Sequence, residues 1–153
     1  MTKKATSNES EASASTDVLT PAQRAFCMSH NRGKDTKPEI LLRSACHALG
    51  LRHRLKANIP GRPDFVYMSS KVAVFVDGCF WHACPVHYQA PKTRAEFWNE
   101  KRQRNRARDE AVNALLIERG WVPFRVWEHD VKADVEAVAC HIAELVRERS
   151  RER

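Results

Sequence analysis

Two cysteines and two histidines in the second half of the sequence have a spacing that suits metal ligands. Cys79, Cys84 and His87 lie close together, and His129 follows far downstream. Zinc prefers thiolate and imidazole ligands, and a structural zinc site fills all four positions of a tetrahedron. Pro85 favours the turn that Cys84 and His87 need if they share one ion. The pattern predicts a structural zinc site, although small buried cysteines with solvated histidines would also fit it.

A pair of carboxylates indicates a second metal site of a different kind. Asp64 follows Pro63 at the start of one expected strand, and Asp77 ends the next. In a hairpin of these strands the two carboxylates would meet at one end of the sheet. Carboxylate oxygens suit Mg²⁺, which stabilises charge on a phosphate and lowers the pKa of bound water. An aspartate after proline is also common in turns, so Asp64 alone is weak support.

Three further side chains have types suited to acid–base chemistry beside such a metal. Zinc does not need His82, and a histidine whose pKa lies near neutrality is a good general acid or base. Asp109 shares a helix face with Asn105 and could hydrogen-bond His82, or else pair with a neighbouring arginine. Glu39 fits the third position of a helix capping box, or a carboxylate that orients a water near the metal.

The charge distribution points to nucleic acid. The formal net charge is +7, and a dense set of cations stands at Lys92, Arg94, Lys101, Arg102, Arg104, Arg106 and Arg108. Such density suits phosphate contacts, whereas a solvated helix face is the ordinary alternative. The neighbouring Phe80 and Trp81 follow a glycine, and apolar wedges of this kind can enter a base stack. Met28 could be another wedge, although methionine more often lies in a core.

The hydrophobic pattern around these residues predicts an α/β fold with a small mixed sheet flanked by helices. We expect helices at 37–49, 96–119 and 132–149, and strands at 51–56, 64–67, 72–77 and 121–127. Pro123 places the last strand near an edge of the sheet or at its own start. Residues 20–35 form a helix or an arm. Residues 1–19 are polar enough to be a disordered tail, which leaves 20–153 as a single domain.

Length and cysteine usage limit the class of protein. A chain of 153 residues suits one domain, and its five cysteines, an odd number, argue against a disulfide framework. Cys27, Cys46 and Cys140 have no apparent role beyond packing. No apolar run reaches the length of a membrane span, so we expect a cytoplasmic protein without a membrane partner.

Taken together, these motifs resemble the very-short-patch repair (Vsr) endonucleases. The resemblance covers about residues 20–145 in register. Its most specific segments are Pro60-Gly61-Arg62-Pro63-Asp64-Phe65-Val66 and Val74-Phe75-Val76-Asp77-Gly78-Cys79-Phe80-Trp81-His82. The others are Lys34-Asp35-Thr36-Lys37-Pro38-Glu39, Thr93-Arg94-Ala95-Glu96-Phe97-Trp98, Gly120-Trp121 and Val126-Trp127-Glu128.

The resemblance implies a restriction-endonuclease-like fold, a structural zinc and Mg²⁺-dependent nicking of one DNA strand. The implied substrate is double-stranded DNA with a T·G mismatch left by deamination of 5-methylcytosine, cut 5′ to the thymine. A functional link to a cytosine-5 DNA methyltransferase follows, and we expect a monomer associated with the nucleoid.

The resemblance also implies a role for each matching residue. Asp64 and the backbone carbonyl of Val76 would bind Mg²⁺, His82 would be the general acid/base, and Glu39 and Asp109 would support them. Phe80 and Trp81 would enter the DNA at the mismatch, opposite Met28. DNA contacts are expected from Lys92, Arg94, Lys101, Arg104, Asn105 and Arg108, and zinc ligation from Cys79, Cys84, His87 and His129.

The chain departs from the family at two places. The best-described form has histidine where Asp77 stands, so Asp77 is expected to act as a further catalytic, metal-linked carboxylate. The cysteines and histidines of the zinc site are also distributed differently, which leaves the exact ligand set open.

Two rival functions are a restriction-type endonuclease that cuts intact duplex and a non-catalytic zinc-containing DNA-binding module. The presence of Asp64, His82 and Asp109 together favours an enzyme.

Overall fold

The structure is a computed structural model that describes residues 19–30 and 33–152. Most of the predicted tail therefore lies outside the described residues. The chain divides into two units, residues 1–31 and 32–153, and each is described by itself. In the first unit, helix α1 (Pro21–His30) has no buried residue. Of the two alternatives expected for residues 20–35, a helix or an arm, the structure has a helix.

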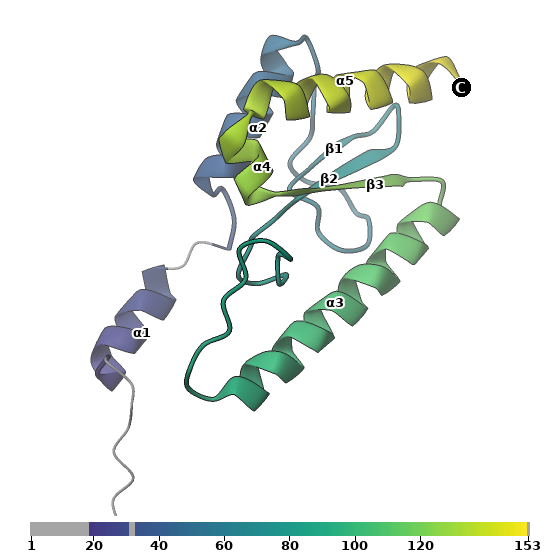
Figure 1. Ribbon diagram of the computed structural model, residues 1–153. Coiled ribbons are helices and arrows are strands. Elements are labelled where there is room, and N and C mark those ends of the chain that lie inside the picture. Colours follow the sequence, from purple (N-terminus) through teal and green to yellow (C-terminus); the bar gives the residue numbers. More distant parts are fainter. Residues whose placement is uncertain (1–18, 31–32, 153) are drawn as a thin grey trace, which may run out of the picture. The chain divides into compact units, whose positions relative to one another are not determined.

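The second unit contains a three-stranded mixed sheet with helices on both faces (Figure 1). Its elements in order are α2 (Lys37–Ala48), β1 (Phe65–Tyr67), β2 (Val72–Asp77), α3 (Ala95–Glu118), β3 (Val122–Trp127), α4 (Glu128–Ala133) and α5 (Val135–Arg151). Strand β2 is central, antiparallel to β1 and parallel to β3. This confirms the predicted small mixed α/β sheet.

Strand alternation divides the core in two, because successive side chains point to opposite faces of a sheet. Tyr67 and Val74 pack with α2, α4 and α5 on one face. Val66 and Phe75 pack with Leu116 of α3 on the other face. Alternation therefore directs Asp77, two residues after Phe75, to the α3 face.

Two predicted elements differ from the structure. The strand expected at 51–56 is absent, and this segment makes only one isolated bridge, between Arg54 and Val66. Leu51 is buried but Leu55 is 43% exposed, so the alternating pattern lacks a second buried anchor. The helix expected at 132–149 is divided into α4 and α5, because Asp134 caps a new helix by accepting a hydrogen bond of 2.9 Å from the amide of Ala137.

The parallel pair β2–β3 determines where distant segments meet. The last pair in register is Asp77 with Trp127, so both strands end at the same edge of the sheet. The segment that begins at Gly78 and the start of α4 at Glu128 therefore emerge side by side. Among the described residues no helix is long and apolar enough to span a membrane.

Candidate functional site

A pocket of about 810 Å³ opens at this edge of the sheet, between the ends of β2 and β3 and the middle of α3. We name it the carboxylate pocket. Its wall includes most of the predicted catalytic residues, with Glu39, Asp64, Val76, Asp77, Phe80, Trp81, His82, Arg108, Asp109, Arg125 and Glu128 among them. The structure thus brings together residues that are up to 89 positions apart in the sequence.

Asp64 lies at the entrance to β1 and is half-buried. Its Oδ2 atom accepts a hydrogen bond of 2.7 Å from the amide of Val76, while Oδ1 has no partner among the described residues. Burial is the main cause that raises the pKa of Asp64 to about 6; the carboxylates of Glu39 and Asp77 contribute to the rise, and the Val76 hydrogen bond opposes it. A carboxylate with a free oxygen and two acidic neighbours is a good fit for a divalent cation.

Glu39 is almost fully buried in the first turn of α2. Its two oxygens accept hydrogen bonds from the amide of Asp35, at 2.8 Å, and from the hydroxyl of Thr36, at 2.7 Å. The capping box predicted here does not form: the Thr36 side chain does not cap the helix, and Glu39 accepts from the amide of Asp35 rather than from that of Thr36. The hydroxyl instead donates to Glu39, which holds that carboxylate against the pocket.

His82 and Asp109 make the hydrogen bond that the sequence predicted. Nδ1 of His82 lies 2.6 Å from Oδ2 of Asp109, and both side chains are about one-fifth exposed. A carboxylate only accepts hydrogen bonds, so Nδ1 carries the proton and Nε2 is left with its lone pair. Asn105, one turn earlier on α3, donates to the backbone carbonyl of Trp81 at 3.0 Å. The loop after β2 is therefore tied to α3 at His82 and at the residue before it.

Asp77 has a partner that the sequence did not reveal. Nη1 of Arg125 donates to both oxygens of Asp77, at 2.8 and 3.1 Å. Burial raises the pKa of Asp77, although His82 and Arg125 oppose that change. Arg125 was expected only as a residue of the last strand. Its position two residues before Trp127 places it on the α3 face, and this alternation is the one signal that could have revealed it.

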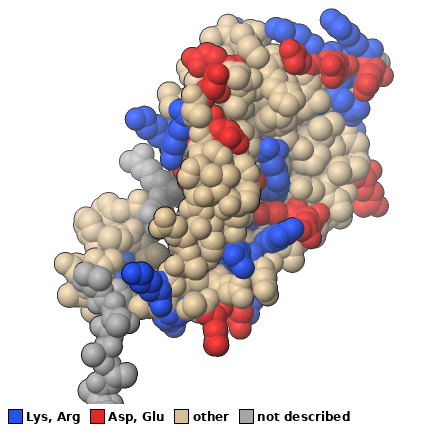
Figure 2. Space-filling model, in the orientation of Figure 1, with Lys and Arg blue, Asp and Glu red and all other residues tan. Residues whose placement is uncertain are grey.

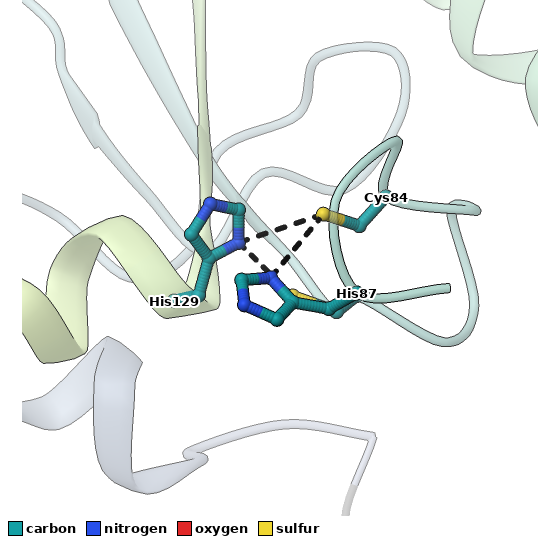
Figure 3. A group of neighbouring side chains, drawn as sticks. Cys84, His87 and His129 are labelled. Carbon is teal, nitrogen blue, oxygen red and sulfur yellow. Dashed lines mark hydrogen bonds between the residues drawn. The ribbon is translucent and has the colours of Figure 1, made fainter. Parts of the chain in front are cut away.

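Four cysteine and histidine side chains converge beyond the ends of β2 and β3. The ligand atoms of Cys79, Cys84, His87 and His129, which we name the Cys/His cluster, all lie within 4.8 Å of one another. Figure 3 shows Cys84 and His87 reaching from one loop toward His129, which stands at the start of α4. The predicted convergence of these four residues is confirmed.

The distances within the Cys/His cluster fit zinc. Nδ1 of His129 lies 3.2 Å from the sulfur of Cys79 and 3.6 Å from that of Cys84, and the Cys84 sulfur lies 3.7 Å from Nδ1 of His87. Tetrahedral zinc with ordinary bond lengths separates sulfur and nitrogen ligands by about 3.6 Å. The other ring nitrogen of His129, Nε2, lies 3.2 Å from Asp130, and metal-binding histidines commonly have such a carboxylate partner.

Cys79 connects the Cys/His cluster with the start of α4. Its amide donates to Oε1 of Glu128 at 3.0 Å, which fixes the backbone just after β2. Burial raises the pKa of the Cys79 thiol to about 11, the hydrogen bond with His129 opposes this, and the neighbouring Cys84 adds to it. A metal must therefore displace a proton from Cys79, which makes metal affinity pH-dependent. The other cysteines are packed or exposed on helices: Cys46 is buried, and Cys27 and Cys140 are exposed.

Phe80 and Trp81 are not core residues. They are 39% and 36% exposed, and their ring centroids lie 5.2 Å apart with the planes nearly perpendicular. Trp98 of α3 packs against both rings, at 5.3 and 6.3 Å between centroids. The ammonium of Lys101 lies 5.1 Å from the Trp81 ring. The pair is thus a supported, outward-facing aromatic edge.

The predicted cations of α3 and the preceding loop are mostly exposed, but they do not form an uninterrupted basic stripe. Figure 2 shows basic and acidic side chains interspersed over α3. Arg104 pairs with Glu100 at 3.4 Å, while Arg94 lies over the Phe97 ring. Lys92 and Arg108 are exposed, and Arg108 lines the carboxylate pocket. Met28 lies on α1 and is 52% exposed. It belongs to the first unit of the chain, whereas this site belongs to the second.

A second hollow, of about 640 Å³, adjoins the carboxylate pocket and shares Asp64 and Arg62 with it. Lys34, Lys56 and Arg62 line it, and none of them has an ion-pair partner among the residues that the structure describes. Arg62 has a positive φ of 51°, in the turn between two prolines. The sequence does not mark these cations as a group, because Lys34 precedes α2 whereas Lys56 and Arg62 lie between α2 and β1.

Comparison with known proteins identifies relatives over most of the chain. The family model described as DNA mismatch endonuclease Vsr matches residues 16–88. The "Type II nicking enzyme V.NaeI" of Lentzea aerocolonigenes is 45% identical over 76% of this chain and 74% of its own length. The "Type II nicking enzyme V.XorIIP" of Xanthomonas oryzae is 38% identical over 86% of this chain and 97% of its own.

A further relative is the "DNA mismatch endonuclease Vsr" of Escherichia coli, which is 40% identical over 73% of each chain. These identities and coverages, together with the family model, agree with the motifs on which the resemblance rested. The chain therefore belongs to the DNA mismatch endonuclease Vsr family.

Proposed function

We propose that this protein is a DNA endonuclease that nicks one strand 5′ to the thymine of a T·G mismatch arising from deamination of 5-methylcytosine. The observation that carries the proposal is the His82–Asp109 pair, 2.6 Å apart, on the wall of the pocket that also holds Asp64. Relatives named as nicking enzymes support cleavage of one strand. The relative named as a mismatch endonuclease supports the mismatch as the substrate.

Asp64 and the carbonyl of Val76 would hold Mg²⁺ in this proposal. The amide of Val76 faces Asp64, and the amide and carbonyl of one strand residue point to the same side. The ion would stabilise charge on the scissile phosphate and lower the pKa of a bound water. Glu39 is held by two hydrogen bonds and would orient that water. Asp77 contributes a further negative charge to the wall.

His82 would move the proton in the hydrolysis step. Its Nδ1–H donates to Asp109, so Nε2 can take a proton from the attacking water or return one to the leaving oxygen. Asp109 fixes the ring and its tautomer without reacting itself. The Cys/His cluster would bind zinc as a structural ion. It anchors the loop that carries Phe80, Trp81 and His82, which gives the catalytic histidine a rigid support.

Phe80 and Trp81 would enter the base stack at the mismatch, where unstacking costs the least free energy. Phosphate contacts would come from Lys92, Arg94, Lys101, Arg104 and Arg108, with Asn105 holding the Trp81 backbone, and Met28 would be the opposing wedge. Lys34, Lys56 and Arg62, which line the second hollow beside Asp64, would contact further phosphates. The proposal also includes a restriction-endonuclease-like fold and a monomeric state. It further includes a cytoplasmic location at the nucleoid and a partner methyltransferase.

A nicking assay on paired duplexes tests this function. The purified full chain is incubated with Mg²⁺ and duplexes that differ only in a central T·G or T·A pair, in every combination of flanking bases and with each strand labelled. We expect a nick 5′ to the thymine in T·G duplexes only. Cleavage of both strands of matched duplexes would instead establish the restriction-type activity, and mismatch binding without any nick would establish a non-catalytic module.

A further inference from the structure

Arg125 lies at the centre of the contacts around His82. It pairs in register with Phe75 of β2, and its guanidinium lies 4.4 Å from the Phe75 ring centroid. Its side chain is only 20% exposed. A cation that is buried to this degree costs free energy unless its donors are used, so its partners matter.

All three guanidinium nitrogens of Arg125 have partners. Nη1 holds both oxygens of Asp77, Nη2 lies 3.4 Å from Oδ1 of Asp109, and Nε donates to Asn113 at 3.0 Å. The arginine thus joins the end of β2 to α3 through two carboxylates. Those same two carboxylates flank His82.

His82 stands between competing acceptors. Its Nδ1 is 2.6 Å from Asp109, whereas its Nε2 is 3.8 Å from Oδ1 of Asp77, beyond hydrogen-bond distance. A neutral imidazole has a single N–H, so only one carboxylate can receive it. Arg125 holds both oxygens of Asp77 and neutralises its charge, which keeps this carboxylate from turning toward Nε2 and favours Asp109 as the acceptor of the His82 N–H.

We propose that Arg125 is a positioning residue that selects the reactive tautomer of His82, by occupying Asp77 and by holding the second oxygen of Asp109. The catalytic consequence rests on the proposed function, whereas the tautomer itself does not. With Arg125 in place, Nε2 of His82 keeps its lone pair toward the carboxylate pocket. Without Arg125, Asp77 would turn to accept Nε2–H, and the nitrogen that faces the pocket would no longer be a base.

The competing explanation is that Arg125 is a structural tether between β3 and α3. A tether would affect stability and binding along with the nicking rate. If Arg125 selects the tautomer, its removal should slow nicking alone. Removing the charge of Asp77 as well should then restore part of the nicking rate. The two explanations therefore predict different outcomes for a double substitution.

The experiment compares Arg125→Met, Arg125→Lys and the double variant Asp77→Asn with Arg125→Met, using Asn113→Ala as the matched control. Single-turnover nicking, mismatch affinity and melting temperature are measured for each. The His82 tautomer is read from its ring ¹⁵N shifts, assigned with His82→Gln. Arg125→Lys keeps a charge beside Asp77 but cannot reproduce the forked contacts, so it serves if Arg125→Met does not fold.

We expect Arg125→Met to nick about 100-fold more slowly, the loss typical of a misplaced catalytic group, with mismatch affinity within about threefold of wild type. The Nε2–H tautomer should appear in this variant. The double variant should nick about tenfold faster than Arg125→Met and should return to the Nδ1–H tautomer. Asn113→Ala should keep the wild-type nicking rate and the Nδ1–H tautomer. An unchanged tautomer in Arg125→Met and Arg125→Lys, or no recovery in the double variant, would overturn the proposal. If wild type nicks no duplex, the proposed function fails, and the tautomer shifts still decide the role of Arg125.

Discussion

The Cys/His cluster and the carboxylate pocket lie at the same edge of one sheet, yet they are built for opposite purposes. The cluster offers four soft or borderline ligands that can close a tetrahedron around one ion. The pocket offers hard oxygen ligands around about 810 Å³ of open space, and one oxygen of Asp64 has no partner within the part of the chain that the structure describes. A closed ligand set leaves no position for a substrate, whereas an open one does.

This difference follows from how the chain reaches each site. The cluster joins the loops that follow two parallel strands, so its formation fixes the backbone around His82. The pocket takes its carboxylates from the residue before β1, from the end of β2, and from α2, α3 and α4, and depends on that backbone being fixed. The cluster should therefore matter first for stability, and the pocket first for the reaction rate. Each prediction below tests this division.

The largest effect should come from opening the Cys/His cluster. His129→Ala or Cys79→Ser should lose the bound zinc and lower the free energy of unfolding by more than about 4 kcal/mol, as expected when a structural metal is lost. Calorimetry and metal analysis would measure this. His141→Ala, which removes an exposed histidine of α5, should retain both zinc and stability. A His129→Ala protein of normal stability would remove the structural role from the cluster.

Removing the pocket carboxylate should have the reverse pattern. Asp64→Ala should slow nicking on the order of 10³-fold, because several kcal/mol of charge stabilisation are lost, and should leave zinc content and mismatch binding intact. Glu144→Ala, at an exposed position of α5, is the control for loss of an acidic residue. Near wild-type nicking by Asp64→Ala in Mg²⁺ would show that this carboxylate does not hold the catalytic ion.

Sequence patterns were sufficient for the parts of the site that lie close together in the chain. The apolar run of β2 was predicted with its observed ends, and the ligand-rich segment after it contains three of the four cluster residues. His129 and the His82–Asp109 contact were also predicted, since each residue type suggested a partner. Local spacing and side-chain chemistry carried these results.

Contacts between elements distant in the sequence were harder to predict. Strand alternation could place Arg125 on the α3 face, but its contacts with Asp77 and Asp109 depend on the register of β3 against β2 and on the placement of α3. The division of the last helix at Asp134 was missed for a local reason. A single capping side chain outweighed a continuous helical pattern.

The raised pKa of Asp64 makes the pocket costly when no metal is bound. Its pKa rises from 3.8 to about 6 on folding, so the folded state binds more protons between these values. Without Mg²⁺, the free energy of unfolding should fall as pH rises through this window and level off above about pH 6. Asp64→Asn should remove this loss. The variant should be more stable than wild type by at most about 3 kcal/mol at pH 7, and almost equal to it at pH 3. Chemical denaturation of wild type and variant at both pH values, without added Mg²⁺, measures it. An equal change in stability at pH 3 and pH 7 would show that Asp64 does not have a raised pKa.

The smallest effect should come from the aromatic edge between the two sites. Trp81→Ala should weaken binding to T·G duplex by about tenfold or more, the worth of one stacked base, and leave salt-sensitive binding to matched duplex unchanged. Its melting temperature should change little, since the ring is 36% exposed. Trp121→Ala, which empties a buried position, should instead lower stability by about 3–5 kcal/mol. Equal losses on both duplexes would count against the wedge.

Metal content and nicking, measured together on one preparation, test the central division most directly. The protein is dialysed against a weak chelator that removes loosely bound ions, analysed for zinc, and assayed on T·G duplex before and after Mg²⁺ is added. We predict one zinc per chain throughout, no nicking before addition and full nicking after it. Active protein without zinc, or nicking without added Mg²⁺, would contradict the assignment of a closed structural site and an open catalytic one.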